Sequence, residues 1–72
     1  MNKETLQHVL NITPRSILRK MHNAGLGDYE LSRRMDMARE TIRDIRIGKN
    51  GGAEFTVRRI REYYIKFLED EE

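Results

Sequence analysis

The stretch GDYELSRRMDMARETIRDIRIGK, residues 27–49, decides the fold of this chain. Its first part predicts a helix over about residues 28–35, because Leu31 and Met35 lie four residues apart and so share one face of a helix. Residues 36–38 break this pattern, and a second helix is expected after them. The stretch therefore has the layout of two short helices joined by a three-residue turn.

The second helix is predicted over about residues 39–47, with Gly48 as its stop. Ile42 and Ile45 are three residues apart and would face the core, which leaves the opposite face outward. In the first helix, Ser32 is small enough to let another helix approach closely. Together these features predict a helix-turn-helix, in which the two helices are held at a steep angle.

The stretch resembles the lambda-repressor-like, Cro/CI type of helix-turn-helix, and the resemblance extends over about residues 14–68. It rests on Ser32 early in the first helix, the apolar Met37 in the turn, Ile42 in the second helix, Gly48-Lys49 after it, and a further amphipathic helix behind. It implies a small phage or bacterial transcription regulator that binds DNA with residues 39–47 as its recognition helix.

Two positions depart from that family's pattern. Asp36 stands where the family usually has a glycine, and aspartate tolerates the left-handed backbone conformation better than most residues. Asp28 stands where the family often places a glutamine against a DNA phosphate. A carboxylate at that position would repel a phosphate, although it suits the N-terminus of a helix.

The remaining segments predict three further helices around one core. They cover about residues 3–10, a segment that begins at Thr13-Pro14 and stops at Gly25, and about residues 55–68. Their inner faces are assigned to Leu6, Val9 and Leu10, to Ile17, Leu18, Met21 and Ala24, and to Val57, Ile60, Tyr64, Phe67 and Leu68. No segment alternates as a strand would. We therefore expect an all-α, compact bundle of about five short helices, with a single helix-turn-helix domain over residues 1–68 and an acidic C-terminal tail over residues 69–72.

The charge of the chain is unevenly distributed. The formal net charge is +2, but the last four residues are all acidic, so residues 1–68 carry +6. Ten of the fourteen basic residues are arginines, which bind phosphate, guanine and carboxylate groups in a bidentate manner. This composition favours a polyanion or an acidic protein surface as partner.

The outward face of the second helix supplies the candidate DNA-binding residues. They are Arg39, Glu40, Thr41, Arg43, Asp44 and Arg46, and Arg33, Lys49 and Asn50 are candidates for phosphate or backbone contacts. Arg58, Arg59 and Arg61 form a second basic cluster, and with Tyr63 and Ile65 they are a candidate partner surface. For each set the alternative is a face that is simply solvated.

Several other classes of function find no support in the residues. The chain has no cysteine, which excludes disulfides and thiolate zinc sites, and its two histidines, His8 and His22, are not spaced to share a metal. The segment GKNGG, residues 48–52, follows a helix and lacks the Ser or Thr of a phosphate-binding loop. We expect no enzyme activity, no cofactor and no small-molecule substrate. No apolar run is long enough for a signal peptide or a membrane span, so a cytoplasmic protein is expected.

Two functions remain open on these grounds. The first is a transcription regulator that binds double-stranded DNA, with a homodimer on a two-fold site as the natural arrangement. The second is a helix-turn-helix module that binds host RNA polymerase and modulates its transcription without reading DNA sequence. The carboxylates Asp28, Glu40 and Asp44 favour the second function, and the arginines of the same helix favour the first.

Overall fold

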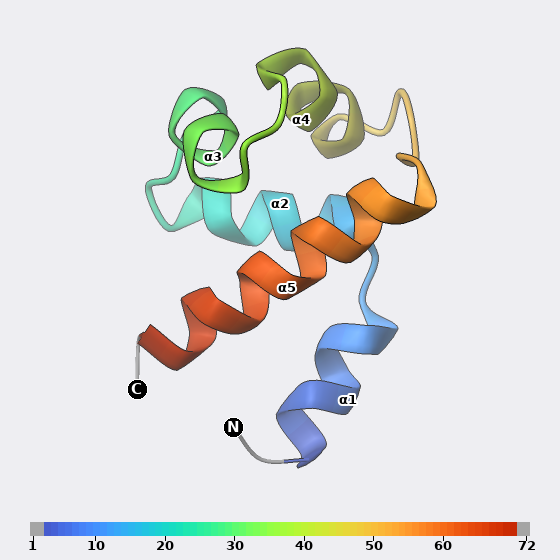
Figure 1. Cartoon of the computed structure of the whole chain (residues 1–72), viewed down its shortest axis with the longest axis vertical. Coiled ribbons are helices and arrows are strands. Elements are labelled where there is room, and N and C mark those ends of the chain that lie inside the picture. Colours follow the sequence, from blue (N-terminus) through green and yellow to red (C-terminus); the bar gives the residue numbers. More distant parts are fainter. Residues whose placement is uncertain (1–2, 71–72) are drawn as a thin grey trace.

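A computed structural model describes residues 3–70, with side chains from residue 7 onward, and every regular element among these residues is a helix (Figure 1). The helices are α1 (Lys3–Asn11), α2 (Pro14–Asn23), α3 (Asp28–Met35), α4 (Arg39–Arg46) and α5 (Glu54–Asp70). The all-α class and the five helices are thus confirmed. Within residues 3–70, no helix combines the length and the apolar character that crossing a membrane requires.

Capping residues set both ends of α2. The side-chain oxygen of Thr13 accepts a hydrogen bond from the backbone N–H of Ser16 at 3.2 Å, and Pro14 is the first helical residue. At the other end Gly25 has a φ of 102°, and the N–H of Leu26 donates to the carbonyl of Met21 at 3.0 Å. This left-handed ending satisfies carbonyls that the helix would otherwise leave unbonded.

α3 and α4 are also followed by residues in the left-handed backbone conformation. Gly48 has a φ of 85° and follows α4, where the N–H of Lys49 donates to the carbonyl of Asp44 at 2.8 Å. Asp36 ends α3 with a φ of 54°, which confirms that the aspartate takes the conformation for which glycine is usually needed. The turn between α3 and α4 is therefore residues 36–38, as predicted.

The core is formed where the five helices pack together. α2 packs against α4 and α5, α3 packs against the same two helices, and α1 packs against α5. In Figure 1, α3 and α4 lie together at the top, and α5 crosses the molecule below them. α1 lies at the lower right, away from α3 and α4. The buried apolar side chains are Val9, Ile17, Leu18, Met21, Leu31, Met35, Ile42, Ile45, Ile60 and Tyr64.

Three details of the predicted core are wrong. Ala24 is exposed, and Leu10 is 57% exposed beside a groove between α1 and α5. Val57 is only half-buried, because Thr56 begins the inner row that continues four residues apart through Ile60 and Tyr64. The predicted inward position of Leu6 lies outside the described side chains.

The boundary of the acidic tail is also different. α5 continues through Glu69 and Asp70, because neither glycine nor proline follows Leu68 to stop the helix. These two residues therefore belong to the last turn of α5. Residues 71–72 lie outside the described part of the chain.

Candidate nucleic-acid interface

The face of α4 that turns away from α2 and α3 is predominantly polar. Arg39, Glu40 and Arg43 are exposed on it, and Thr41 and Asp44 are half-buried. Among the described residues, neither Arg39 nor Arg43 forms a side-chain hydrogen bond or an ion pair. Their guanidinium groups, four residues apart on one helix, are therefore available to an external acceptor.

Arg46, which was predicted to contact DNA bases, is instead bound within the protein. Its guanidinium donates two hydrogen bonds to Asp28, Nε to Oδ1 at 2.9 Å and Nη2 to Oδ2 at 2.8 Å. The Arg46 and Asp28 side chains are 23% and 19% exposed, and the pair joins the last turn of α4 to the first turn of α3. The base contact of Arg46 stays a prediction, and in the structure this long side chain reaches back across the turn to Asp28.

The same pair changes the electrostatics of Asp28. The hydrogen bonds from Arg46 hold the pKa of the Asp28 carboxyl below its ordinary value, against the opposing effect of partial burial. In return, Asp28 raises the pKa of Arg46. The carboxylate that would repel a phosphate is thus ionised but neutralised by its partner, and the position no longer carries an uncompensated negative charge.

A cleft of about 520 Å³ lies between the first turns of α3 and α4. It is lined by Gly27, Asp28, Tyr29, Arg39, Glu40 and Arg43. The residues that precede the two helices, Gly27 and Ala38, make no side-chain capping hydrogen bond. The N–H groups of both first turns are therefore left to other acceptors, since a helix cannot bond them internally.

Two exposed apolar residues of α3 and α4 were missed by the sequence reasoning, one in the lining of this cleft and one at the far end of α4. Tyr29 is 61% exposed, with the guanidinium of Arg33 5.9 Å from the centre of its ring. Ile47 is 46% exposed directly after the last turn of α4. Their exposure could have been predicted from spacing, because Tyr29 is not three or four residues from the buried residues of α3, and Ile47 is not three or four residues from those of α4.

The predicted phosphate contacts lie at different places on the surface. Arg33 is exposed on α3, and Lys49 is exposed in the turn after α4. Asn50 is exposed in the same turn, but its side-chain oxygen accepts the N–H of Gly52 at 2.7 Å and so stabilises the turn. A further basic side chain, Arg15, donates through Nε to the carbonyl of Arg46 at 3.3 Å and was not foreseen in this role.

The three arginines of the second basic cluster differ in their surroundings. Arg58 is exposed, but Arg59 donates to the carbonyls of Met35 at 3.4 Å and Asp36 at 3.0 Å, at the end of α3. Arg61 donates through Nη2 to the carbonyl of Ile12 at 3.2 Å, and its Nε is buried. Arg58 and Arg61, three residues apart, line the same groove between α1 and α5, whereas Arg59 points toward the end of α3.

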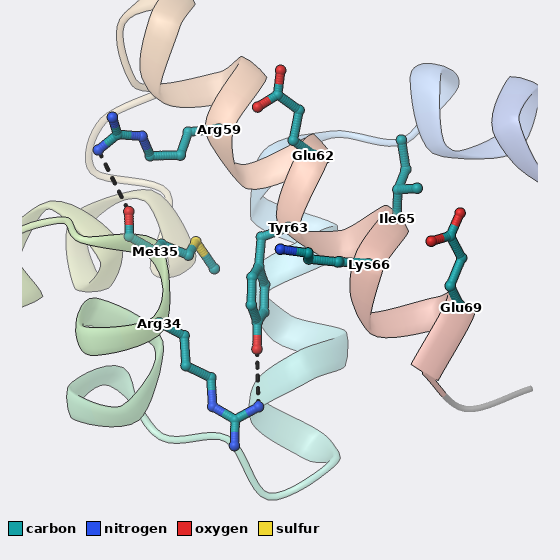
Figure 2. A pocket seen from close by; sticks show the side chains of 8 residues that line it. All are labelled: Arg34, Met35, Arg59, Glu62, Tyr63, Ile65, Lys66 and Glu69. Atoms are coloured by element: carbon teal, nitrogen blue, oxygen red, sulfur yellow. Dashed lines mark hydrogen bonds between the residues drawn. The ribbon is translucent and has the colours of Figure 1, made fainter.

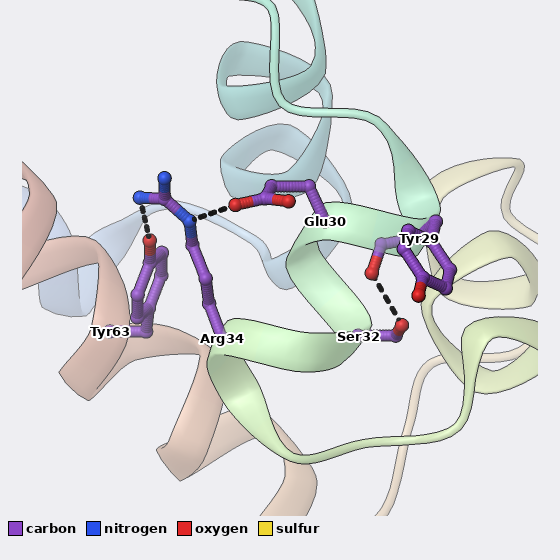
Figure 3. A network of polar contacts seen from close by, with 5 residues as sticks. All are labelled: Tyr29, Glu30, Ser32, Arg34 and Tyr63. Atoms are coloured by element: carbon purple, nitrogen blue, oxygen red, sulfur yellow. Dashed lines mark hydrogen bonds and ion pairs between the residues drawn. The ribbon is translucent and has the colours of Figure 1, made fainter.

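Tyr63 and Ile65 also point in different directions (Figure 2). Both line a groove of about 310 Å³ beside α5, but Tyr63 points toward Arg34 of α3 and Ile65 points away from it. The Tyr63 hydroxyl accepts from Nη1 of Arg34 at 3.0 Å, and Nε of Arg34 donates to Glu30 at 2.8 Å (Figure 3). Tyr63 therefore joins α5 to α3 and is half-buried.

Ser32, the small residue of α3, forms a hydrogen bond within its own helix. The hydroxyl of Ser32 is half-buried and donates to the carbonyl of Tyr29 at 2.6 Å (Figure 3). In the following turn, Met37 is half-buried and packs against the core, as its predicted place requires.

Comparisons of the chain with protein-family models, with curated proteins and with solved structures give no match. The case for a function rests on the residues and their geometry.

Proposed function

We propose that this chain is a small transcription regulator that binds double-stranded DNA, with α3 and α4 acting as a helix-turn-helix and α4 entering the major groove. One observation carries the proposal. Arg39 and Arg43 are exposed on α4 without a partner among the described residues, while Arg46 neutralises Asp28, the carboxylate at the first turn of α3.

The dimensions and residue types of α4 suit base contacts. Its eight residues span about 12 Å, and the major groove is about 12 Å wide and admits a helix. An arginine can bind the O6 and N7 atoms of guanine in a bidentate manner, and Glu40 could accept a hydrogen bond from the amino group of cytosine. Ile47 adds an apolar side chain for a thymine methyl group.

The surroundings of α4 suit the DNA backbone. Phosphates bind well at helix N-termini, and the first turns of α3 and α4 border the same cleft without side-chain caps. The hydroxyl of Tyr29 and the cations of Arg33 and Lys49 are exposed near the ends of the two helices. Such contacts would set the position of α4 on the duplex, and the side chains of α4 would supply the sequence preference.

Selection of binding sites from a random duplex library tests this function. We expect the wild-type chain to enrich one sequence pattern. Arg43→Ala should lose the preference at one or two base positions, a loss of about 1–3 kcal/mol of discrimination. Arg19→Ala, which removes an exposed arginine from α2, is the matched control and should enrich the wild-type pattern. Enrichment of no pattern by the wild-type chain would overturn the proposal.

A second candidate function is supported by the acidic residues of α4. Glu40 is exposed between the two free arginines in sequence, and Asp44 lies four residues after it, so the face has mixed charge. A protein surface with acidic and basic groups could complement this face, and host RNA polymerase is the partner we propose for it. A pull-down from bacterial lysate with and without nuclease separates the two functions, because polymerase subunits retained after nuclease treatment would favour the second.

A further inference from the structure

The dipeptide Asn50-Gly51 lies in the turn between α4 and α5. Neither residue belongs to a helix, and both are exposed. Glycine has no Cβ, so its backbone nitrogen can approach the side-chain carbonyl of a preceding asparagine with little steric hindrance. The sequence has four asparagines, and a glycine follows only this one. The pair is therefore suited to a reaction between the asparagine side chain and the backbone that follows it.

The side chain of Asn50 is folded back over the backbone that follows it. Its Oδ1 accepts a hydrogen bond from the N–H of Gly52 at 2.7 Å, which is the bond of an Asx turn. The ring that this bond closes contains both the Cγ of Asn50 and the nitrogen of Gly51. The same N–H would stabilise the negative charge that develops on Oδ1 when a nucleophile attacks Cγ.

The backbone nitrogen of Gly51 is the nucleophile in this arrangement, and it is free. Its N–H forms no hydrogen bond with another described residue. The space around Gly51 is also open, because a Cβ at this position would have no atom within 4 Å. The nitrogen can therefore lose its proton to a base from the solvent and move toward the side chain of Asn50 without breaking a contact.

The other described asparagines lack this freedom. Asn11 and Asn23 are the last residues of α1 and α2. In each case the backbone N–H of the following residue donates to a carbonyl of the helix, at 3.2 Å after Asn11 and at 3.0 Å after Asn23. The nitrogen that would attack is thus already bonded at both positions, and the chain contains its own internal comparison for Asn50.

We propose that Asn50 is a site of spontaneous deamidation, in which the backbone nitrogen of Gly51 attacks the Cγ of Asn50. A bond forms between these two atoms, the bond from Cγ to Nδ2 breaks, and Nδ2 takes a proton and leaves as ammonia. The product is a five-membered cyclic imide. Water then opens the imide at Cγ to give aspartate, or at the main-chain carbonyl of residue 50 to give isoaspartate. Both products have a carboxylate in place of a neutral amide.

The new negative charge would arise beside basic residues. Lys49 is exposed directly before Asn50, and Arg15 lines the same groove of about 470 Å³ as Asn50 and Gly51. A carboxylate at residue 50 would offset the charge of Lys49 and oppose a nearby phosphate, so the modified chain should bind a polyanion more weakly. This consequence rests on the proposed function, whereas the deamidation itself does not.

Peptide mapping by mass spectrometry of the folded chain, incubated at mildly alkaline pH, tests the proposal. A synthetic peptide with the sequence of residues 46–54 serves as the reference for the unhindered reaction. We expect Asn50 to convert at a rate within about tenfold of the peptide, because an exposed turn opens at little cost, and Asn11 and Asn23 to stay intact. Isoaspartate, detected by an isoaspartate-specific methyltransferase, should accompany aspartate, since direct hydrolysis of the amide would give aspartate alone. Slower conversion than this, or aspartate without isoaspartate, would overturn the proposal.

Gly51→Ala is the matched variant. The φ of Gly51 is not in the left-handed region and its surroundings are open, so alanine should leave the fold unchanged by circular dichroism. Conversion of Asn50 should slow by about tenfold or more, because the new methyl group hinders the attacking nitrogen. An unchanged rate would overturn the proposal. Asn50→Asp should weaken duplex binding. If it does not while the wild-type chain still deamidates, the proposed function loses support and the modification site does not.

Discussion

At the scale of single residues, the pair between Asp28 and Arg46 has the largest consequence. It fixes the end of α4 to the beginning of α3 through two hydrogen bonds between mostly buried groups. It also decides which arginines of α4 remain free. Without it, the candidate site would have one more cation and one unpaired carboxylate, and Asp28 would oppose a nearby phosphate.

Asp28→Asn tests this pair through folding stability. We expect a loss of about 1–2 kcal/mol in the free energy of unfolding near neutral pH, because Arg46 loses a charged acceptor. The pKa of Asp28 is lower in the folded chain than its ordinary value of 3.8. The stability that Asp28 provides is therefore complete above that value and is lost as the pH falls through the lowered pKa.

Urea unfolding across a pH series measures this effect. The wild-type and Asp28→Asn curves should differ at neutral pH and converge at acidic pH. Glu30→Gln is the control, because Glu30 is also an acidic residue of the first turn of α3 but forms a more exposed pair with Arg34. A difference between wild type and Asp28→Asn that stayed constant at every pH would argue against the pair as its source.

Asp36→Gly tests the turn between α3 and α4. A left-handed conformation costs most residues free energy and costs glycine almost none, so we expect a gain of about 0.5 kcal/mol, after allowance for the greater flexibility of glycine in the unfolded chain. Asp36→Ala should lose stability at the same position. Thermal or urea unfolding of the three chains would show the order, and a destabilised glycine variant would contradict the argument.

The arginines show where prediction from sequence fails at this scale. Helical periodicity placed Arg46, Arg59 and Arg61 outside the core, but each reaches a partner 18 to 49 residues away in the chain. An arginine side chain is long, and its planar group bonds carbonyls and carboxylates wherever the fold presents them. Spacing along one helix contains no information on those partners, whereas the exposure of Arg39 and Arg43 follows from it.

At the scale of elements, the central helices could be predicted closely. Thr13-Pro14, Gly25 and Gly48 are local signals, and they set the same limits for α2 and α4 in the structure. The end of α5 could not be predicted in this way, because no capping residue follows Leu68. The burial of Thr56 could not be predicted either, because threonine is not a strongly apolar residue. The packing of α5 against α1, α2 and α3 decides which of its residues face inward.

α1 is the element attached by the fewest neighbours, and Arg61 is one of its attachments. The guanidinium of Arg61 bonds the carbonyl of Ile12, directly after α1, at 3.2 Å. In Arg61→Ala we expect the amides of α1 to exchange with solvent about tenfold faster, while those of α2 to α4 keep their protection. Hydrogen exchange with mass spectrometry measures this directly.

Arg19→Ala, which removes an exposed arginine from α2, is the control for this experiment. It should leave the exchange of α1 unchanged. Uniformly faster exchange in every helix of Arg61→Ala would contradict a local role and would show that the residue stabilises the whole fold.

At the scale of the whole molecule, the proposed function depends on the distribution of charge. The face of α4 has two free arginines, and exposed cations outnumber exposed carboxylates on this helix. One chain alone would contact a single half-site of a duplex, and a two-fold site would need two copies of α4.

The dependence of DNA affinity on salt follows from this distribution. Arg33, Arg39, Arg43 and Lys49 are exposed cations on α3, on α4 and in the turn after it, and none of them forms an ion pair with another described residue. If each neutralises one phosphate, the logarithm of the association constant should fall with the logarithm of salt concentration with a slope of about 3–4 per chain. Lys49→Ala should reduce the slope by about 1 for every sequence tested. A slope near zero would show that phosphate contacts contribute little.

The measurement that tests the central claim most directly compares two duplexes of equal composition, the selected site and a scrambled version of it. Fluorescence anisotropy at fixed salt would give the ratio of the two affinities for wild type, Arg39→Ala, Arg43→Ala and the control Arg19→Ala. Contact of α4 with bases predicts a wild-type preference for the selected site that falls about tenfold or more in both α4 variants and persists in the control. An unchanged preference in Arg39→Ala and Arg43→Ala would contradict the assignment of α4 as the helix that reads DNA.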